Sequence, residues 1–375
     1  MRTFFFCFFI FTAILVSGQE ITVGNDKIRR TLAFDGGVWR TVRFSAGSSR
    51  TTLELKSEEF YILPLDSNQG FSIRDFTVLG QPETRQSADT NFVRISYTPK
   101  PGIKRNPSLP ATIHILYFAV RGEAHLRKSI VLHFPAAATV DRLEVERFVV
   151  NRPATGGGRG EPVFIDGRWF TGLEYPAGYS RHTDGNSPVD YARHYEKVGN
   201  YSFIDLAGRD IEPEASQGMV RLMHFPGFAV LNKEKKFSVA SKTAVCGISE
   251  AGSRVEDAFM RYLATVWKAP RSFLHYNNWF EPKAKDLSGD ALVDIWKEFR
   301  KSIAPYGVKM DAMVVDDGRQ DRKSIWQPSP KFFPQQWESV RVLSRKLKDE
   351  GIDFGLWLSL NGYTNNIDGG QAGVS

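Results

Sequence analysis

The chain has 375 residues, of which 42% are hydrophobic and 24% are charged, and this composition excludes a disordered or collagen-like protein. Its formal net charge is +7, but the lysines and arginines are scattered and form no nucleic-acid-binding module. We interpret them as solvated surface and expect no nucleic-acid partner. At about 150 residues per domain, the length predicts two domains.

The first eighteen residues differ from the remainder of the chain. Arg2 supplies their only charge, and an apolar run from Phe4 to Val16 follows it. Such a run is too short to span a bilayer stably, and Ser17 and Gly18 suit a signal-peptidase site. We therefore expect residues 1–18 to be a signal peptide and the protein to be secreted or periplasmic. No second apolar run reaches the length of a membrane span.

Cysteine and histidine usage limits the ways in which the fold can be stabilised. Cys7 lies in the expected signal peptide, so the exported chain keeps Cys246 alone. A single thiol can form neither an intrachain disulfide nor a cysteine zinc site. His182 and His194 lack the spacing of a metal site, and we expect neither a metal ion nor another cofactor. The hydrophobic core must therefore stabilise the fold, as a chain of this size permits.

Residues 19–250 have the period of two that is typical of strands. Val93, Ile95 and Tyr97, for example, alternate with polar residues, and no helical stretch interrupts the pattern. We expect a large antiparallel β-sandwich. Further strand-like runs occur at residues 41–44, 52–55, 112–118, 129–134 and 143–150. The glycine-rich run Gly156–Gly160 lacks the ending of a phosphate-binding loop, so we interpret it as a flexible loop.

A helical period appears after this region. Apolar residues from Val255 to Val266 fall on one face of a helix, and Ser253 and Glu256 have the spacing of a capping box. Pro270 is expected to end or follow the helix. We interpret residues 251–270 as a connector helix between the two domains.

Strands and helices alternate in residues 271–375. Strands are expected at residues 273–279, 312–315 and 354–360, and helical stripes run from Ala291 to Ile303 and from Trp337 to Leu347. This order predicts a parallel sheet with right-handed crossovers. The expected helix-terminal residues are Ser288 and Gly307 for the first helix, and Pro334 and Gly351 for the second.

The repeat length favours an incomplete barrel over an open sheet. Each βα unit spans about 40 residues, so a (β/α)8 TIM barrel would need about 320 residues. The sequence after Ser272 is much shorter. A three-stranded open sheet would leave an unprotected edge. We therefore favour a β-sandwich followed by the first three βα units of a truncated (β/α)8 TIM barrel.

Polar and aromatic residues collect at the ends of the expected parallel strands, where α/β proteins place their working residues. Asn277, Asn278 and Trp279 end the first strand, Asp316 and Asp317 follow the second, and Trp357 lies within the third. Paired carboxylates can accept hydrogen bonds from sugar hydroxyls, and an indole face packs on the C–H face of a sugar. Two alternatives stay open: the acids form only a turn, or Trp357 is a core residue.

Four segments in order resemble the start of the catalytic barrel of glycoside hydrolase family 36, the α-galactosidases or melibiases. The family pattern runs Asn-Ser-Trp-Glu, Asp-Asp-Gly-Trp, Gly-Asp-Trp with Phe-Pro, and Gly-Leu-Trp-Phe-Glu-Pro. The corresponding segments here are Asn277-Asn278-Trp279-Phe280-Glu281, Asp316-Asp317-Gly318-Arg319, Ile325-Trp326 with Phe333-Pro334, and Phe354-Gly355-Leu356-Trp357. The family also carries a β-sandwich before its barrel.

The resemblance implies roles for individual residues. Asp316 and Asp317 would bind galactosyl hydroxyls, and Trp279 and Trp357 would form walls of the same pocket. Arg319 stands where the family has tryptophan, Ile325 replaces an aspartate, and Ser359-Leu360-Asn361 replaces Glu-Pro-Glu. These departures leave the sugar and the linkage open.

The resemblance also implies a retaining mechanism, which needs two carboxyls about 5 Å apart. The family supplies them from later barrel strands, so we expect no catalytic carboxylate within this chain and no activity from the chain alone. The expected function is that of an exported α-galactosidase-like glycoside hydrolase acting on an oligosaccharide or glycoside. The alternative is a non-catalytic secreted carbohydrate-binding protein. The sequence does not indicate an oligomeric state.

Overall fold

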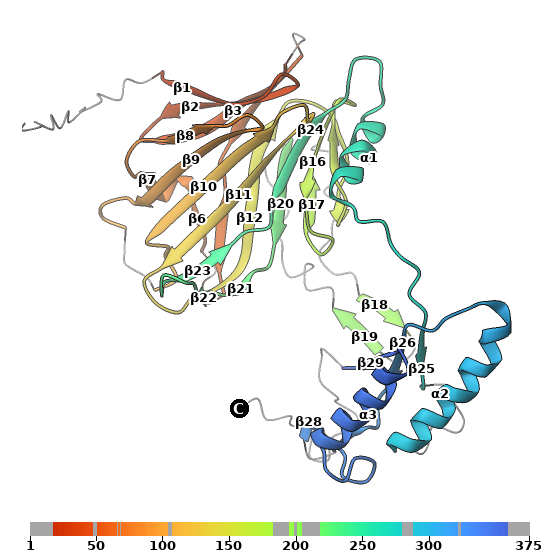
Figure 1. The fold of residues 1–375 in the computed structure, drawn as a ribbon. Coiled ribbons are helices and arrows are strands. Elements are labelled where there is room, and N and C mark those ends of the chain that lie inside the picture. Colours follow the sequence, from red (N-terminus) through yellow and green to blue (C-terminus); the bar gives the residue numbers. More distant parts are fainter. Residues whose placement is uncertain are drawn as a thin grey trace, which may run out of the picture. The chain divides into compact units, whose positions relative to one another are not determined.

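The computed structural model describes residues 18–47, 51–65, 67, 69–103, 107–182, 195–198, 201–204, 218–279, 288–321 and 324–358. The expected signal peptide therefore lies almost wholly outside the described residues. The chain divides into two compact units, Met1–Trp267 and Lys268–Ser375. Figure 1 labels most of their helices and strands.

Two antiparallel sheets of eleven strands each build the first unit. The first sheet contains β1 (Glu20–Gly24), β2 (Ile28–Asp35), β3 (Val38–Ala46), β4 (Thr52–Ser57), β12 (Thr139–Val150), β20 (Met219–His224), β17 (Tyr179–His182) and β14 (Gly158–Arg159), joined by β5 (Tyr61–Pro64), β6 (Phe71–Ser72) and β21 (Gly227–Phe228). The short helix η1 (Ile73–Asp75) follows β6.

The second sheet contains β13 (Ala154–Gly156), β15 (Val163–Ile165), β16 (Trp169–Leu173), β24 (Ala244–Ile248), β11 (His125–Phe134), β10 (Thr112–Val120), β9 (Thr90–Pro99) and β7 (Phe76–Val78), joined by β8 (Glu83–Gln86), β22 (Val230–Leu231) and β23 (Phe237–Ala240). A separate hairpin pairs β18 (Tyr195–Val198) with β19 (Tyr201–Ile204). All the strand-like runs expected from the sequence lie within strands of these two sheets, so the antiparallel β architecture is confirmed.

The two sheets pack face to face through the alternating apolar residues of their strands. Trp39 from the first sheet and Ile95 and Ile115 from the second are fully buried in one shared cluster. A second cluster joins Phe44 to Trp169, whose ring centroids are 6.2 Å apart. Each fully buried side chain of this size stabilises the fold by roughly 1.5 to 3 kcal/mol relative to an exposed one.

The glycine-rich run is not a flexible loop as predicted. Gly156 ends β13 in one sheet and Gly158 begins β14 in the other, so the run carries the chain between the sheets. Gly156 and Gly157 have φ angles of 75° and 86°, which side chains rarely adopt. A Cβ at Gly156 would lie 2.7 Å from the Pro162 carbonyl oxygen. The crossing therefore requires glycine.

Helix α1 (Val255–Val266) packs on the second sheet of the first unit. Val255, Ala258 and Tyr262 share an apolar cluster with Phe170 of β16 and Val245 of β24. Because the chain divides after Trp267, this helix belongs to the first unit.

The expected capping box is wrong. Arg254 is the N-cap residue and makes no side-chain capping bond. The Ser253 N–H closes a turn onto the Glu250 carbonyl (3.1 Å), and this turn delays the helix start by one residue.

No helix among the described residues is long and apolar enough to cross a bilayer.

The second unit contains a parallel sheet in the order β25 (His275–Asn277), β26 (Ala312–Val315), β29 (Asp353–Leu356). The connecting helices are α2 (Gly289–Ile303), which continues into η3 (Ala304–Tyr306), and α3 (Trp337–Asp349). A hairpin of β27 (Gln320–Asp321) and β28 (Ser324–Pro328) precedes α3. The βαβαβ order is therefore confirmed, but the described residues form three parallel strands and no closed barrel.

The helix ends agree with the sequence in part. Ser288 is the N-cap of α2 but makes no side-chain capping bond. Gly307 and Gly351 follow their helices with φ angles of 69° and 79°, as expected of C-terminal glycines. Pro334 does not begin the second helix, because the Gln336 N–H closes a turn onto the Phe333 carbonyl (2.7 Å) and α3 starts at Trp337.

Candidate functional site

The parallel sheet brings the predicted polar residues together at its carboxyl edge. Asn277 ends β25, and Asp316 directly follows β26, whose residue Val314 is in register with Asn277. The Asn277 side-chain amide donates to Asp316 Oδ2 (2.5 Å), and the Asp316 N–H donates to Asn278 Oδ1 (2.7 Å). The two strand ends are therefore joined through side chains as well as through the sheet.

The acid pair has a turn role in addition to any ligand role. The Asp317 N–H donates to Asp316 Oδ1 (2.7 Å), and the Gly318 N–H donates to Asp317 Oδ1 (2.8 Å). Both oxygens of Asp316 therefore accept protein hydrogen bonds, and this residue is only 7% exposed. Asp317 is half-buried and can meet a solute. Asp316 holds the strand end, and Asp317 is the acid with access to solvent.

Both tryptophans of the predicted site are exposed. Trp279 is 58% exposed, and its backbone N–H donates to Asn277 Oδ1 (2.9 Å). Trp357 is 39% exposed, and its backbone N–H donates to the Val315 carbonyl (3.0 Å) at the end of β26. An exposed indole that is fixed through its backbone offers a flat apolar surface to a ligand. The core alternative for Trp357 is therefore wrong, because its side chain is not enclosed.

Arg319 has a position that the sequence alone did not reveal. Its side chain is 2% exposed, and Nη2 donates to the Trp357 carbonyl oxygen (2.9 Å). The Arg319 carbonyl accepts from the Ser329 N–H (2.8 Å). The residue therefore links the segment after β26 to the end of β29. A buried guanidinium can serve this purpose because its several donors reach backbone carbonyls in different directions.

Other residues of the family resemblance lie elsewhere. Phe333 is buried in the core of the second unit, beside Leu343 and Trp296. Phe280 and Glu281, the side chains of Ile325 and Trp326, and residues 359–361 lie outside the described parts of the chain, as does His194. Within the described ranges, no three histidine, cysteine, aspartate or glutamate residues are placed to hold a metal ion.

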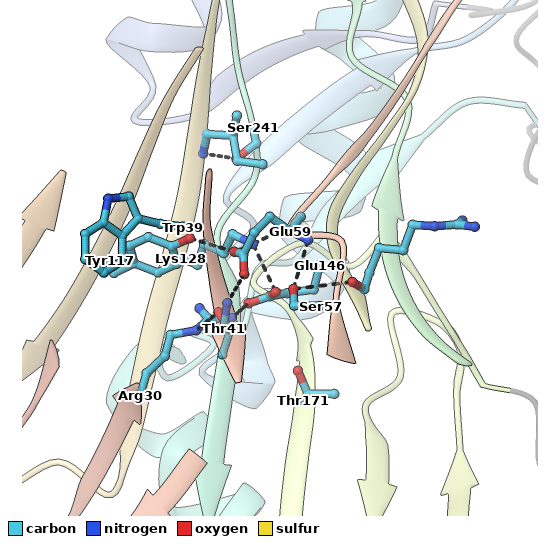
Figure 2. Close-up of polar contacts among 12 residues, drawn as sticks. Arg30, Trp39, Thr41, Ser57, Glu59, Tyr117, Lys128, Glu146, Thr171 and Ser241 are labelled. Carbon is cyan, nitrogen blue, oxygen red and sulfur yellow. Dashed lines mark hydrogen bonds and ion pairs between the residues drawn. The ribbon is translucent and has the colours of Figure 1, made fainter. Parts of the chain in front are cut away.

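A second polar cluster lies inside the sandwich and was missed by the sequence analysis (Figure 2). Lys128 of β11 donates to Glu59 Oε2 (2.8 Å) and Glu146 Oε2 (3.0 Å), and Arg30 of β2 donates to Glu146 Oε1 (2.5 Å). Tyr117 of β10 donates its hydroxyl to Glu59 Oε2 (2.6 Å). The cluster therefore connects the two sheets and balances two cations against two anions.

Burial and charge act against each other in this cluster. Every charged side chain in it is at most 3% exposed. Burial alone would raise the pKa of the Glu59 carboxyl, but the charges of Lys128 and Arg30 outweigh burial and hold that pKa far below its usual range. Burial and the Glu59 charge raise the pKa of Tyr117 well above its usual value. Glu59 and Tyr117 therefore keep one protonation state at ordinary pH, and the burial of the whole cluster indicates a structural role.

No protein-family model matches the sequence, and no curated protein matches it. Solved structures with a similar fold include the family 36 α-galactosidase AgaB from Geobacillus stearothermophilus, with a TM-score of 0.47 and 12% identity over 92% of this chain and 56% of that chain. A variant of AgaA from the same organism, in complex with raffinose, gives 0.47 and 11% over 91% and 56%.

A variant of a glycoside hydrolase family 97 enzyme from Pseudoalteromonas sp. strain K8 is similar with a TM-score of 0.44 and 11% identity, over 89% of this chain and 53% of that chain. The chain thus spans little more than half the length of each of these three proteins. All three are glycoside hydrolases.

Proposed function

We propose that this chain is part of an exported glycoside hydrolase of the α-galactosidase type, and that the carboxyl edge of its parallel sheet binds the terminal sugar. The observation that carries the proposal is the strand order: Asp317 follows the middle strand β26, and the exposed Trp279 and Trp357 follow its two neighbours, β25 and β29, at the same edge of the sheet. A half-buried carboxylate beside flat apolar surfaces suits a ligand with hydroxyls on one side and C–H groups on the other.

The acid pair serves binding rather than bond cleavage in this proposal. Asp316 already accepts one protein hydrogen bond at each carboxylate oxygen, so both oxygens are engaged in holding the strand end and the turn. A retaining glycosidase needs two carboxyls about 5 Å apart on either side of the glycosidic bond. We assign that pair to later strands of a (β/α)8 barrel, of which the sheet of the second unit is the beginning.

The test is a calorimetric titration with galactose, glucose and N-acetylgalactosamine, using the product of the complete reading frame. Asp317→Asn should weaken binding of the preferred sugar by roughly 1.5 to 3 kcal/mol, which is about 10- to 100-fold. Asp317 suits this test better than Asp316, because Asn at 316 would set its amide against the Asn277 amide and disturb the turn.

Asp294→Asn is the matched control. Asp294 is exposed on α2, and its substitution removes the same charge at a position away from the proposed site. Equal affinity of the wild type and Asp317→Asn for every bound sugar would remove the acid pair from the site. Sugar binding without turnover of an aryl α-galactoside by the complete product would favour the non-catalytic carbohydrate-binding protein.

A further inference from the structure

A groove opens at one edge of the first unit, far along the chain from the acid pair. Its larger part is a cavity of about 510 Å³ between the β1–β2 turn, the β8–β9 turn and the end of β10. A second cavity of about 240 Å³ lies between β1, β8 and β9. The two parts share four lining residues, Gly24, Arg29, Gln86 and Asn91, and therefore form one continuous groove.

The topology of the sheets explains why the groove exists. β1 is the outermost strand of the first sheet. In the second sheet, β8 pairs with β9 along one of its edges, and its other edge pairs with no described strand. Two strand edges, one from each sheet, therefore form opposite walls. The Asn91 amide donates to the Gly24 carbonyl (2.6 Å), and the Asn25 amide donates to the carbonyls of Val120 (2.5 Å) and Glu123 (2.9 Å). These bonds hold the walls together, so the groove is preformed.

Three arginines give the groove its chemistry. Arg29, Arg85 and Arg121 line it and are exposed. None of their side chains forms an ion pair or a hydrogen bond with another described residue. Asp26 and Asp89 also line the groove, so the cations exceed the anions by one. A guanidinium binds a carboxylate or a sulfate through two parallel hydrogen bonds, which gives both affinity and orientation.

The remaining lining suits a saccharide. Gln86, Asn91, Thr22 and Thr84 supply amides and hydroxyls, and Phe92 supplies a half-buried aromatic ring. The carboxylates of the groove can accept sugar hydroxyls, but they would repel a polyanion that carries a charge on every unit of its backbone. This combination favours a hydroxyl-rich ligand with spaced anionic groups over a nucleic acid.

We propose that this groove binds an acidic oligosaccharide, whose carboxylate or sulfate groups meet Arg29, Arg85 and Arg121. The site is separate from the acid pair of the second unit and binds whether or not that pair holds a sugar. In a glycoside hydrolase, this groove would bind the enzyme to an acidic polysaccharide.

The experiment titrates the 375-residue chain with hyaluronan oligosaccharides, which carry a carboxylate on every second sugar, with sparsely sulfated dextran and, as the neutral control, with unmodified dextran. Binding of either anionic probe, at least tenfold tighter than unmodified dextran and weakened by added salt, is expected. The preference between the two probes shows whether a carboxylate or a sulfate is the natural group. Equal binding of all three polymers, or tighter binding of a single-stranded oligonucleotide, would overturn the proposal.

Matched variants locate the site. The double change Arg29→Gln and Arg121→Gln should weaken binding of the preferred probe 10- to 100-fold, because charged hydrogen bonds are lost. The control is Lys233→Gln with Lys235→Gln, which removes the same charge from an exposed part of the same unit. Asp317→Asn should leave this affinity unchanged, so a failure here is distinct from a failure at the acid pair. An equal loss in the arginine and lysine variants would show binding by overall charge and contradict the groove.

Discussion

The acids inside the sandwich and the acids of the parallel sheet differ in what surrounds them. Glu59 and Glu146 are sealed between two sheets and face Lys128 and Arg30 directly. Asp317 lies in a turn after β26 and is half-buried, and the exposed Trp279 and Trp357 follow the neighbouring strands of the same sheet. A carboxylate that is enclosed with its counter-ions can stabilise or destabilise a fold, but it cannot bind a solute.

The buried charge cluster can specify how the two sheets align even where it adds little net stability to the fold. Burying two ion pairs costs several kcal/mol per ion in lost hydration, and attraction between the ions offsets this cost only when geometry and hydrogen bonding are good. Here Thr41 and Tyr117 complete the hydrogen bonds of Glu59 and Arg30. The cluster can therefore specify how the two sheets align, because any slip of either sheet would leave a buried charge unpaired.

The largest expected effect comes from removing one member of the buried cluster. Lys128→Met should destabilise the first unit by about 3 to 5 kcal/mol, because it leaves the charges of Glu59 and Glu146 undercompensated. Urea unfolding followed by tryptophan fluorescence measures the change. Lys233→Met, at an exposed position, should change stability by no more than about 0.5 kcal/mol. A loss below about 1 kcal/mol for Lys128→Met would mean that the cluster is not needed for stability.

The next effect concerns a buried group without a counter-ion. His224 is 2% exposed, and its Nε2 accepts from the Lys242 N–H (3.1 Å). Burial and the nearby Lys242 charge lower its pKa from 6.5 to about 4. As the pH falls, the unfolded chain binds a proton at His224 before the folded chain does. The free energy of unfolding is therefore unaffected by His224 above pH 6.5 and decreases as the pH falls from 6.5 toward 4.

His224→Gln should therefore remove up to about 3 kcal/mol of the acid destabilisation between these two pH values. Glutamine can still accept from the Lys242 N–H. The measurement is the urea midpoint of both proteins at several pH values between 4 and 7. His114, His125 and His133, whose pKa values are also lowered by burial, contribute the same pH dependence to both proteins. Parallel curves for the two proteins would contradict the assignment to His224.

The smallest effect is expected at an exposed indole. Trp279→Ala should weaken sugar binding by about 1 kcal/mol, or roughly fivefold, through the loss of a flat apolar contact. The unfolding free energy of the second unit should not change, because the side chain is 58% exposed. Calorimetric titration and urea unfolding on the same preparation separate the two quantities. A loss of stability with unchanged affinity would give Trp279 a packing role instead.

The sequence predicted those features that depend on neighbouring residues. Alternation along β9 and β10 indicated strands, and the order of elements placed Asn277 and Asp316 at one sheet edge, where the structure joins them. The buried charges were harder to predict, because Arg30 and Glu146 are 116 residues apart and each alone looks like a surface residue. Their one signal is a charge at an inward-facing strand position among apolar neighbours.

Local signals failed where a turn competed with them. Ser253 and Pro334 are good helix-starting residues, but each lies in a backbone turn that precedes its helix. The role of Arg319 could not be predicted, because the link to the Trp357 carbonyl exists only once β29 lies beside β26. Tertiary contacts decide such positions, and local sequence carries little information about them.

The most direct test of the contrast between the two acid clusters is an NMR titration of the indole N–H groups with galactose. The chain has eight tryptophans, and Trp279→Phe and Trp357→Phe identify the two resonances of the proposed site. These two signals should shift in proportion to bound sugar, while those of the buried Trp39, Trp169 and Trp296 should stay in place. Saturable sugar binding that moves neither the Trp279 nor the Trp357 resonance would contradict a sugar site at the edge of the parallel sheet.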